Sequence, residues 1–250
     1  MQRRRFYAPP DLINGSRVNL SRDETHHLTR VLRLRPGDEA FVFDGCGREY
    51  RCAFLAVKDD SARLEIKAEL SGEVESPINL TLAQALAKGE RFELAIQKAT
   101  ELGVNSIIPL LTEHADVKLS DERSEKRLER WRRISLEALK QSGRRRLTEI
   151  KPPVTFKDFL ESQGGGSSVL LVFSERGGDS ITKALAGSVD KKRVAAMVGP
   201  EGGWGDDELK LAADCGARAV TLGPRILRTE TAAIVAIALI QHALGDLSAP

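Results

Sequence analysis

The segment from Leu222 to Ile240, LGPRILRTETAAIVAIALI, constrains the fold of this 250-residue chain more than any other. A strand is expected over residues 219–222, a Gly-Pro turn follows it, and a run of apolar helix formers begins after Thr229-Glu230-Thr231. Thr229 is the expected N-cap, because its side-chain oxygen can accept a hydrogen bond from a free N–H of the first turn. Such a helix start offers backbone donors and a positive dipole end to a polar ligand.

A second strand-to-helix junction lies upstream, where RVAAMV is followed by GPEGGWGDDE. The glycine spacing matches neither a G-x-G-x-x-G dinucleotide fingerprint nor a Walker loop, which needs a following Gly-Lys-Ser/Thr. Missing Cβ atoms would let the backbone contact a ligand directly, and a tight turn without a ligand is the alternative interpretation. Glu201 would repel phosphate and therefore favours a cationic or neutral ligand. Together the two junctions predict one binding site made from two loops.

Residues 1–72 are predicted to form a small β domain. Alternating apolar runs, separated by turn residues, lie at residues 39–44, 48–57 and 61–70. One helix interrupts them, and its start at Ser21–Glu24 matches a capping box.

After Ser76-Pro77 the pattern changes to alternating strands and helices. Strands are expected at residues 78–85, 104–111, 169–173 and 194–198, and a long basic helix at residues 124–142. This alternation indicates an α/β fold with a parallel sheet buried on both faces. We place a domain boundary near residue 72, so that the second domain comprises residues 73–250.

The distribution of charge along the chain says more about possible partners than the net charge, which is only +2. Residues 123–146 hold ten Lys or Arg against three Asp or Glu, and Arg3-Arg4-Arg5 opens the chain. A solvated helix face is the simpler explanation of such a run. The combined excess favours a surface that follows the phosphates of a nucleic acid.

Other classes of site are excluded by residue usage. The four histidines show no metal-ligand spacing, so we predict no metal, and the three cysteines (Cys46, Cys52, Cys215) form no CxxC pair. An odd cysteine count fits a reducing cytoplasm. No apolar stretch resembles a secretory signal, and the apolar run 232–240 is far shorter than the about 20 residues that span a bilayer. We therefore expect a cytoplasmic protein without a membrane segment.

Five segments together resemble the ribosomal RNA small subunit methyltransferase E family, of the SPOUT superfamily. They are HHLTRVLRLRPGD (26–38), AKGERFELAIQKATELGV (87–104), EALKQSGR (137–144), GPEGGW (199–204) and LGPRILRTETA (222–232). The resemblance implies an N-terminal PUA-like β-barrel that binds RNA and a C-terminal α/β methyltransferase domain with a trefoil knot, a rare topology. The chain departs from the family at His114, where relatives usually carry arginine, and at Thr148, where proline is common.

The resemblance further implies S-adenosylmethionine as methyl donor and N3 of a uridine in 16S ribosomal RNA, or in the small ribosomal subunit, as acceptor. The acceptor must lose a proton, so Glu230 is the candidate base and Arg228 the candidate stabiliser of the uridine anion. The expected cofactor contacts are Leu171, Val172, Phe173, Ser174, Gly199, Pro200, Glu201, Gly202, Leu222, Gly223, Arg225, Ile226, Leu227, Thr229, Thr231 and Ala232. The expected RNA-binding residues are Arg3, Arg4, Arg5, Arg30, Arg33, Arg144, Arg145 and Arg146.

Members of the superfamily pair through the knotted domain, and the apolar helix 232–240 has more hydrophobic surface than one sheet face would cover, so we expect a homodimer. Two other classes stay open at this point. An RNA-binding protein without activity would keep the basic surface but would not need two glycine loops. A nucleotide-dependent oxidoreductase would need a phosphate cradle.

Overall fold

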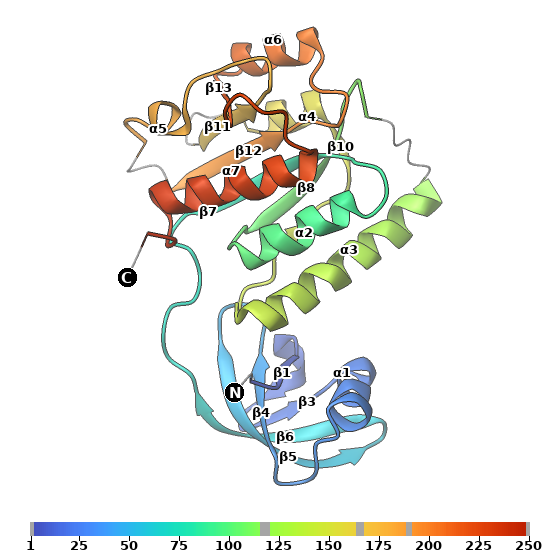
Figure 1. Cartoon of the computed structure of the whole chain (residues 1–250). Coiled ribbons are helices and arrows are strands. Elements are labelled where there is room, and N and C mark those ends of the chain that lie inside the picture. Colours follow the sequence, from blue (N-terminus) through green and yellow to red (C-terminus); the bar gives the residue numbers. More distant parts are fainter. Residues whose placement is uncertain (1–2, 116–120, 164–167, 189–191, 249–250) are drawn as a thin grey trace. The chain divides into compact units, whose positions relative to one another are not determined.

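The computed structural model describes residues 3–115, 121–163, 168–188 and 192–248, which form two compact units. The first unit comprises residues 1–75 together with 139–147, and the second comprises residues 76–138 together with 148–250. A boundary near residue 72 stays a prediction, and it took no account of the segment 139–147, which groups with the first unit. Figure 1 labels the elements in chain order.

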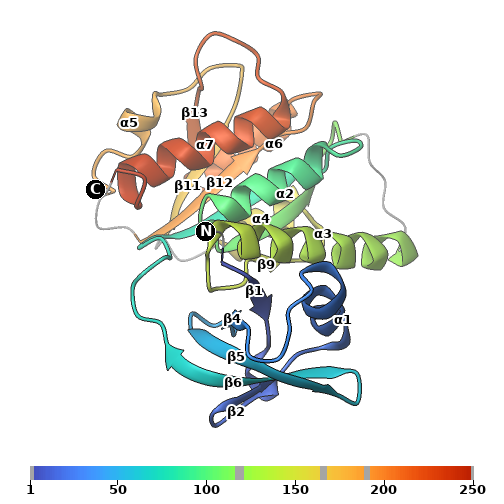
Figure 2. The ribbon, with the colours of Figure 1, turned by 60° about the horizontal axis from the view of Figure 1, so that its bottom comes forward.

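The first unit is built around a six-stranded sheet with the order β1-β4-β5-β6-β3-β2. Its strands are β1 (Arg5–Tyr7), β2 (Ile13–Asn14), β3 (Arg17–Asn19), β4 (Glu39–Phe43), β5 (Glu49–Lys58) and β6 (Ser61–Glu69). All pairings are antiparallel except β1 with β4. Figure 2 shows the long strands β5 and β6 curving along their length. Side chains such as Val42, Phe54 and Leu64 alternate inward and form one buried core.

Short helices complete this unit. A 3-10 helix (η1, Pro10–Leu12) precedes β2, and α1 (Arg22–His26) continues directly into a π-helical turn (η2, His27–Val31). Ser21 caps α1 as expected, because its Oγ accepts a hydrogen bond from the Glu24 backbone N–H at 3.3 Å.

The second unit is an α/β domain with a parallel sheet of order β10-β8-β7-β12-β11-β13, in which β9 also pairs with β8. The strands are β7 (Asn79–Ala85), β8 (Ser106–Leu111), β9 (Glu149–Ile150), β10 (Val154–Thr155), β11 (Ser168–Phe173), β12 (Arg193–Val198) and β13 (Arg218–Val220). The runs expected at residues 78–85, 169–173 and 194–198 coincide with central strands, because continuous apolar sequence is what a doubly covered sheet needs. The trefoil knot stays a prediction.

Helices cover both faces of this sheet. The helices are α2 (Arg91–Glu101), α3 (Asp121–Ser142), α4 (Phe156–Ser162), α5 (Ile181–Ala184), α6 (Asp206–Asp214) and α7 (Thr229–Leu244). One core joins alternate strand residues to α2, α3 and α7, and a second joins the intervening residues to α4 and α6. Figure 1 shows α2 and α7 side by side across one face. Helix α3 begins in the second unit, and its last residues, from Leu139, belong to the first.

Candidate active site

Three neighbouring strands of the second unit, β12, β11 and β13, end at one pocket of about 360 Å³. The loops that follow these strands line it, within residues 173–175, 198–203 and 221–229, together with Ala232 of α7. Ligands of open α/β sheets bind outside the carboxyl ends of the strands. The volume falls in the range of about 300–1,000 Å³ that small-molecule sites occupy. The two junctions recognised in the sequence therefore form one cavity, to which the loop after β11 contributes.

Most of the residues that the sequence assigned to the cofactor lie at this pocket. Those lining it are Phe173, Ser174, Gly199, Pro200, Glu201, Gly202, Leu222, Gly223, Arg225, Ile226, Leu227, Thr229 and Ala232, and the candidate catalytic Arg228 joins them. Glu175, Val198, Gly203 and Thr221 also line it and were not predicted.

Leu171, Val172 and Thr231 do not line the pocket. Leu171 and Val172 are central residues of β11, and alternation along the strand places one in each of the two cores. Only the end of the strand, from Phe173, reaches the pocket. Thr231 lies exposed in the first turn of α7.

The sequence suggested that Thr229 is the N-cap of α7, and this prediction was wrong. The helix begins at Thr229 and its N-cap is Arg228, which makes no capping hydrogen bond through its side chain. The Thr229 hydroxyl donates instead to the backbone carbonyl of Gly199 at 2.6 Å and accepts from Gln84 Nε2 at 2.8 Å. Thr229 therefore ties the start of α7 to the loop after β12.

The glycines of the loop after β12 make room for other side chains of the protein. A Cβ on Gly199 would lie 3.0 Å from the indole Nε1 of Trp204, and a Cβ on Gly202 would lie 2.8 Å from the Cβ of His114. Direct approach to a ligand is therefore not the only reason for these glycines. Gly223, in the other loop, has a positive φ of 98° and open space around its Cβ position.

Two residues buttress this loop. Trp204 is buried, and its Nε1 donates to the Phe173 carbonyl at 2.8 Å, which joins the loop after β12 to the end of β11. On the other side, Nδ1 of His114 lies 3.3 Å from the Gly203 carbonyl oxygen. His114 thus contacts the loop that lines the pocket.

Charges at the pocket are unevenly compensated. Glu201 Oε1 pairs with Nη1 of Arg91, the first residue of α2, at 2.9 Å. Within the described residues, neither Arg225 nor Arg228 forms an ion pair, and both are exposed. The two cations are therefore free to meet an anionic ligand.

Glu230, the candidate base, does not line the pocket. Its side chain is buried in the first turn of α7, and its Oε2 has no hydrogen-bond partner in the described part of the chain. A buried carboxylate oxygen without a partner is costly, so it is more typical of functional positions than of structural ones.

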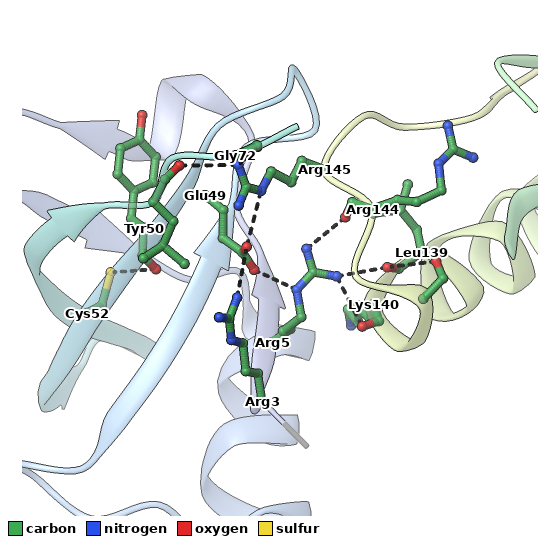
Figure 3. A network of polar contacts seen from close by, with 12 residues as sticks. Arg3, Arg5, Glu49, Tyr50, Cys52, Gly72, Leu139, Lys140, Arg144 and Arg145 are labelled. Atoms are coloured by element: carbon green, nitrogen blue, oxygen red, sulfur yellow. Dashed lines mark hydrogen bonds and ion pairs between the residues drawn. The ribbon is translucent and has the colours of Figure 1, made fainter. Parts of the chain in front are cut away.

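Of the arginines expected to bind RNA, Arg5, Arg144 and Arg145 are buried in a polar network of the first unit (Figure 3). Arg5 Nε donates to Glu49 Oε1 at 2.6 Å, and Arg145 Nε donates to Glu49 Oε2 at 3.2 Å. Arg144 Nη2 donates to Glu75 Oε2 at 2.8 Å. The structure thus indicates a structural role for these three, because their donors face protein acceptors and not solvent.

The remaining arginines assigned to RNA are exposed: Arg3, Arg4, Arg30, Arg33 and Arg146. Arg33, two residues after the π-helical turn, has a positive φ of 54°, a conformation that non-glycine residues adopt rarely. RNA contact by these five side chains stays a prediction.

Two other kinds of chemistry would need groups of metal-ligating side chains or reactive thiols among the described residues. No group of three or more His, Cys, Asp or Glu side chains within the described ranges could hold a metal ion. Burial raises the pKa of the Cys52 thiol to about 12, so it is protonated at neutral pH, and the exposed Cys215 does not line the pocket. No helix in the part of the chain that the structure describes could cross a membrane.

Sequence reasoning did not assign Gln84, Arg91 or His114 to the site, although all three contact the pocket loops from outside them. Gln84 lies near the end of β7, Arg91 starts α2, and His114 follows β8. The position of Gln84 was a usable signal, because a polar side chain next to the carboxyl end of a strand lies at the edge of the sheet that carries the site. The other two contacts depend on tertiary packing that no local pattern encodes.

Two family models match the chain. An RNA methyltransferase domain matches residues 74–241, and an RNA methyltransferase PUA domain matches residues 20–67. Solved relatives support the same assignment. A ribosomal RNA small subunit methyltransferase E from Neisseria gonorrhoeae, bound to S-adenosylmethionine, is 36% identical with a TM-score of 0.89, and the match covers 98% of this chain and 99% of that one. A putative methyltransferase from Legionella pneumophila, also in complex with S-adenosylmethionine, is 35% identical with a TM-score of 0.90, covering 99% and 100% of the two chains.

Curated sequences agree. The ribosomal RNA small subunit methyltransferase E of Synechocystis is 39% identical over 245 residues, which cover 96% of this chain and 78% of that protein. The protein of the same name from Bacillus subtilis is 31% identical, with 90% and 89% covered. The chain therefore belongs to the ribosomal RNA small subunit methyltransferase E family.

Proposed function

We propose that the chain is an S-adenosylmethionine-dependent methyltransferase that methylates N3 of a uridine in 16S ribosomal RNA. The observation that carries this proposal is the pocket at the ends of β11, β12 and β13. Two solved relatives of 35–36% identity contain bound S-adenosylmethionine, which supports this pocket as the cofactor site. Bound there, the cofactor would supply an electrophilic methyl group. The alternatives, an inactive RNA-binding protein and an oxidoreductase, lack comparable support.

The lining fits a ligand with an apolar ring, hydroxyl groups and a cationic centre. Leu222, Leu227 and Ala232 provide apolar surface for an adenine, and backbone groups of the loops would read its edges. Glu201 is 28% exposed on its side chain and keeps one carboxylate oxygen away from Arg91, so it can meet hydroxyl donors or a positive charge. Open space beside Gly223 leaves the backbone accessible to the ligand.

The acceptor would be handled by the start of α7. Arg228 is exposed at the pocket and would stabilise negative charge on O2 or O4 of the uridine as N3 loses its proton. Glu230 is the candidate base because of its unpartnered Oε2. Its burial means that the substrate, or a local rearrangement, would have to expose this oxygen.

RNA would be held by the PUA-like domain (residues 1–72) through Arg3, Arg4, Arg30 and Arg33, together with Arg146, while the methyltransferase domain (residues 73–250) carries the pocket. Action on 16S ribosomal RNA or the small subunit would place the protein in the cytoplasm.

A homodimer would cover the outer face of α7, where Ile234, Val235 and Leu239 are only half-buried. Because this face carries apolar side chains and no charge, a second copy is the simplest cover. Sedimentation of a fully active monomer at micromolar concentration would contradict the dimer.

The function is tested in two steps. Calorimetry should detect S-adenosylmethionine binding to the purified protein and no binding of a nicotinamide dinucleotide. Mass spectrometry of ribosomal RNA from a deletion strain should show the loss of one N3-methyluridine, restored by the wild-type gene and not by an Arg228→Ala variant. An unchanged set of methylated nucleosides would contradict the proposal.

A further inference from the structure

Three elements of the second unit meet in one chain of hydrogen bonds. Gln84 Nε2 donates to Thr229 Oγ1 at 2.8 Å, and Thr229 Oγ1 donates to the Gly199 carbonyl at 2.6 Å. Gln84 is near the end of β7, opposite Val198 of β12, and Thr229 is the first residue of α7. The Gln84 and Thr229 side chains are buried, with residue exposures of 1% and 5%.

The direction of each hydrogen bond follows from the donors available. A threonine hydroxyl has one proton, and the Gly199 carbonyl can only accept, so Thr229 must donate to Gly199 and accept from Gln84. Gln84 Nε2 also donates to the Ala85 carbonyl at 3.2 Å, which fixes the same orientation of its amide.

This orientation has a cost at Gln84. It leaves Oε1 buried and, within the described residues, without a hydrogen-bond partner. An unsatisfied buried acceptor destabilises a fold, so a glutamine that serves stability alone would be a poor choice at this position. Gly199 and Thr229 line the pocket, whereas Gln84 does not.

We propose that Gln84 is a positioning residue of the cofactor site, which acts through the Thr229 hydroxyl to hold the loop after β12 against the start of α7. The amide fixes the hydroxyl rotor, the hydroxyl fixes the Gly199 carbonyl, and the two loops are held at a set separation before the ligand binds. This inference rests on the proposed function, because it takes the ligand to be S-adenosylmethionine.

Calorimetric titration of S-adenosylmethionine into three variants tests the chain link by link. Thr229→Val removes the hydroxyl and nearly keeps the side-chain shape, and Gln84→Met removes the amide at similar length. Each should weaken binding about tenfold or more, since a buried hydrogen bond to the positioned loop is lost. Thr229→Ser keeps the hydroxyl and should bind clearly more tightly than Thr229→Val.

A matched control separates positioning from stability. Thr148 is as buried as Thr229, at 6%, and its Oγ1 donates to the Val104 carbonyl at 2.9 Å, away from the pocket. Thr148→Val should lower the unfolding midpoint without changing cofactor affinity. Gln84→Met also removes the unpartnered oxygen, so the unfolding midpoint of this variant should fall little. Its affinity for S-adenosylmethionine should fall strongly. A purely structural role of Gln84 would not produce this combination.

Each outcome has a meaning. Variants Gln84→Met and Thr229→Val that bind as tightly as the wild type would overturn the inference alone, as would an equal loss of affinity in Thr148→Val. A wild-type protein that binds no S-adenosylmethionine would overturn the proposed function, and the inference with it.

Discussion

The polar network of the first unit and the pocket of the second use charge in opposite ways. Glu49 is 1% exposed and receives hydrogen bonds from Arg5 and Arg145, so buried charge meets buried charge. Arg228 is exposed at the pocket without an ion pair, and Glu230, in the first turn of α7 but not in the pocket lining, keeps a buried oxygen without a partner, within the residues described. The buried charges of the network satisfy one another within the protein, whereas the unpaired groups remain available to a ligand.

Breaking the network should give the largest effect. Glu49→Ala leaves Arg5 and Arg145 buried without their carboxylate, and removing one partner of a buried ion pair costs about 3–5 kcal/mol. Urea unfolding followed by a signal from the first unit should therefore shift strongly. The affinity for S-adenosylmethionine, measured where the variant is folded, should not change, because the pocket lies in the second unit.

Glu39→Ala is the matched control for this prediction. Glu39 lies on β4 of the same sheet and pairs with Arg51 at 3.8 Å, with more than half of both side chains exposed. An exposed pair of this kind contributes about 0–1 kcal/mol. Equal destabilisation by the two substitutions would mean that the Glu49 network is no more important than a surface ion pair.

Gly202→Val should have an effect smaller than that of Glu49→Ala, and it should change cofactor affinity more than stability. Backbone strain is not the reason, because the positive φ in this loop belongs to Gly203, at 75°, and not to Gly202. The obstacle is steric, since a Cβ on Gly202 would lie 2.8 Å from the Cβ of His114 and the loop would have to shift. Calorimetry should show a loss of about tenfold or more, on the scale of about 1.4 kcal/mol for each factor of ten.

A second substitution checks this cause. In a Gly202→Val protein, His114→Gly removes the Cβ that the valine meets and should restore part of the affinity. If the double variant binds no better than Gly202→Val, contact with His114 is not the reason for the loss.

The sequence predicted the second unit well because its signals are local. Continuous apolar runs marked β11 and β12 as strands of a buried sheet, and the glycines directly after β12 marked a ligand site at its edge. The errors were shifts of one or two residues along an element, and they changed the roles assigned to the residues concerned. Helix α7 begins at Thr229 itself, so the hydroxyl is free for Gly199 and not used for capping. Leu171 and Val172 lie one or two residues too far inside their strand to reach the pocket.

The first unit was harder to predict because its contacts are long-range. A run of arginines has the same composition whether its side chains are solvated, bind phosphate or are buried. Arg145 is buried because it meets Glu49, which lies 96 residues away in the sequence, and Arg144 meets Glu75, 69 residues away. Only the fold brings these carboxylates together with the arginines, so a count of charges could not separate Arg144 and Arg145 from Arg146.

Substitution of Arg146 should have the smallest effect, and it tests whether an exposed arginine beside the buried network is available to RNA. Its side chain is exposed without an ion pair in the described residues, while its backbone N–H donates to Glu75 Oε1 at 3.0 Å. Arg146→Ala should therefore leave the network intact and remove one phosphate contact. The slope of log affinity for 16S ribosomal RNA against log salt should fall in magnitude by about 0.7–0.9, as one set of condensed counterions is no longer released. Arg146→Lys keeps the charge and should keep the slope, and neither variant should change cofactor affinity. An unchanged slope in Arg146→Ala would mean that this arginine is only solvated, and the RNA surface would then have to be sought among Arg3, Arg4, Arg30 and Arg33.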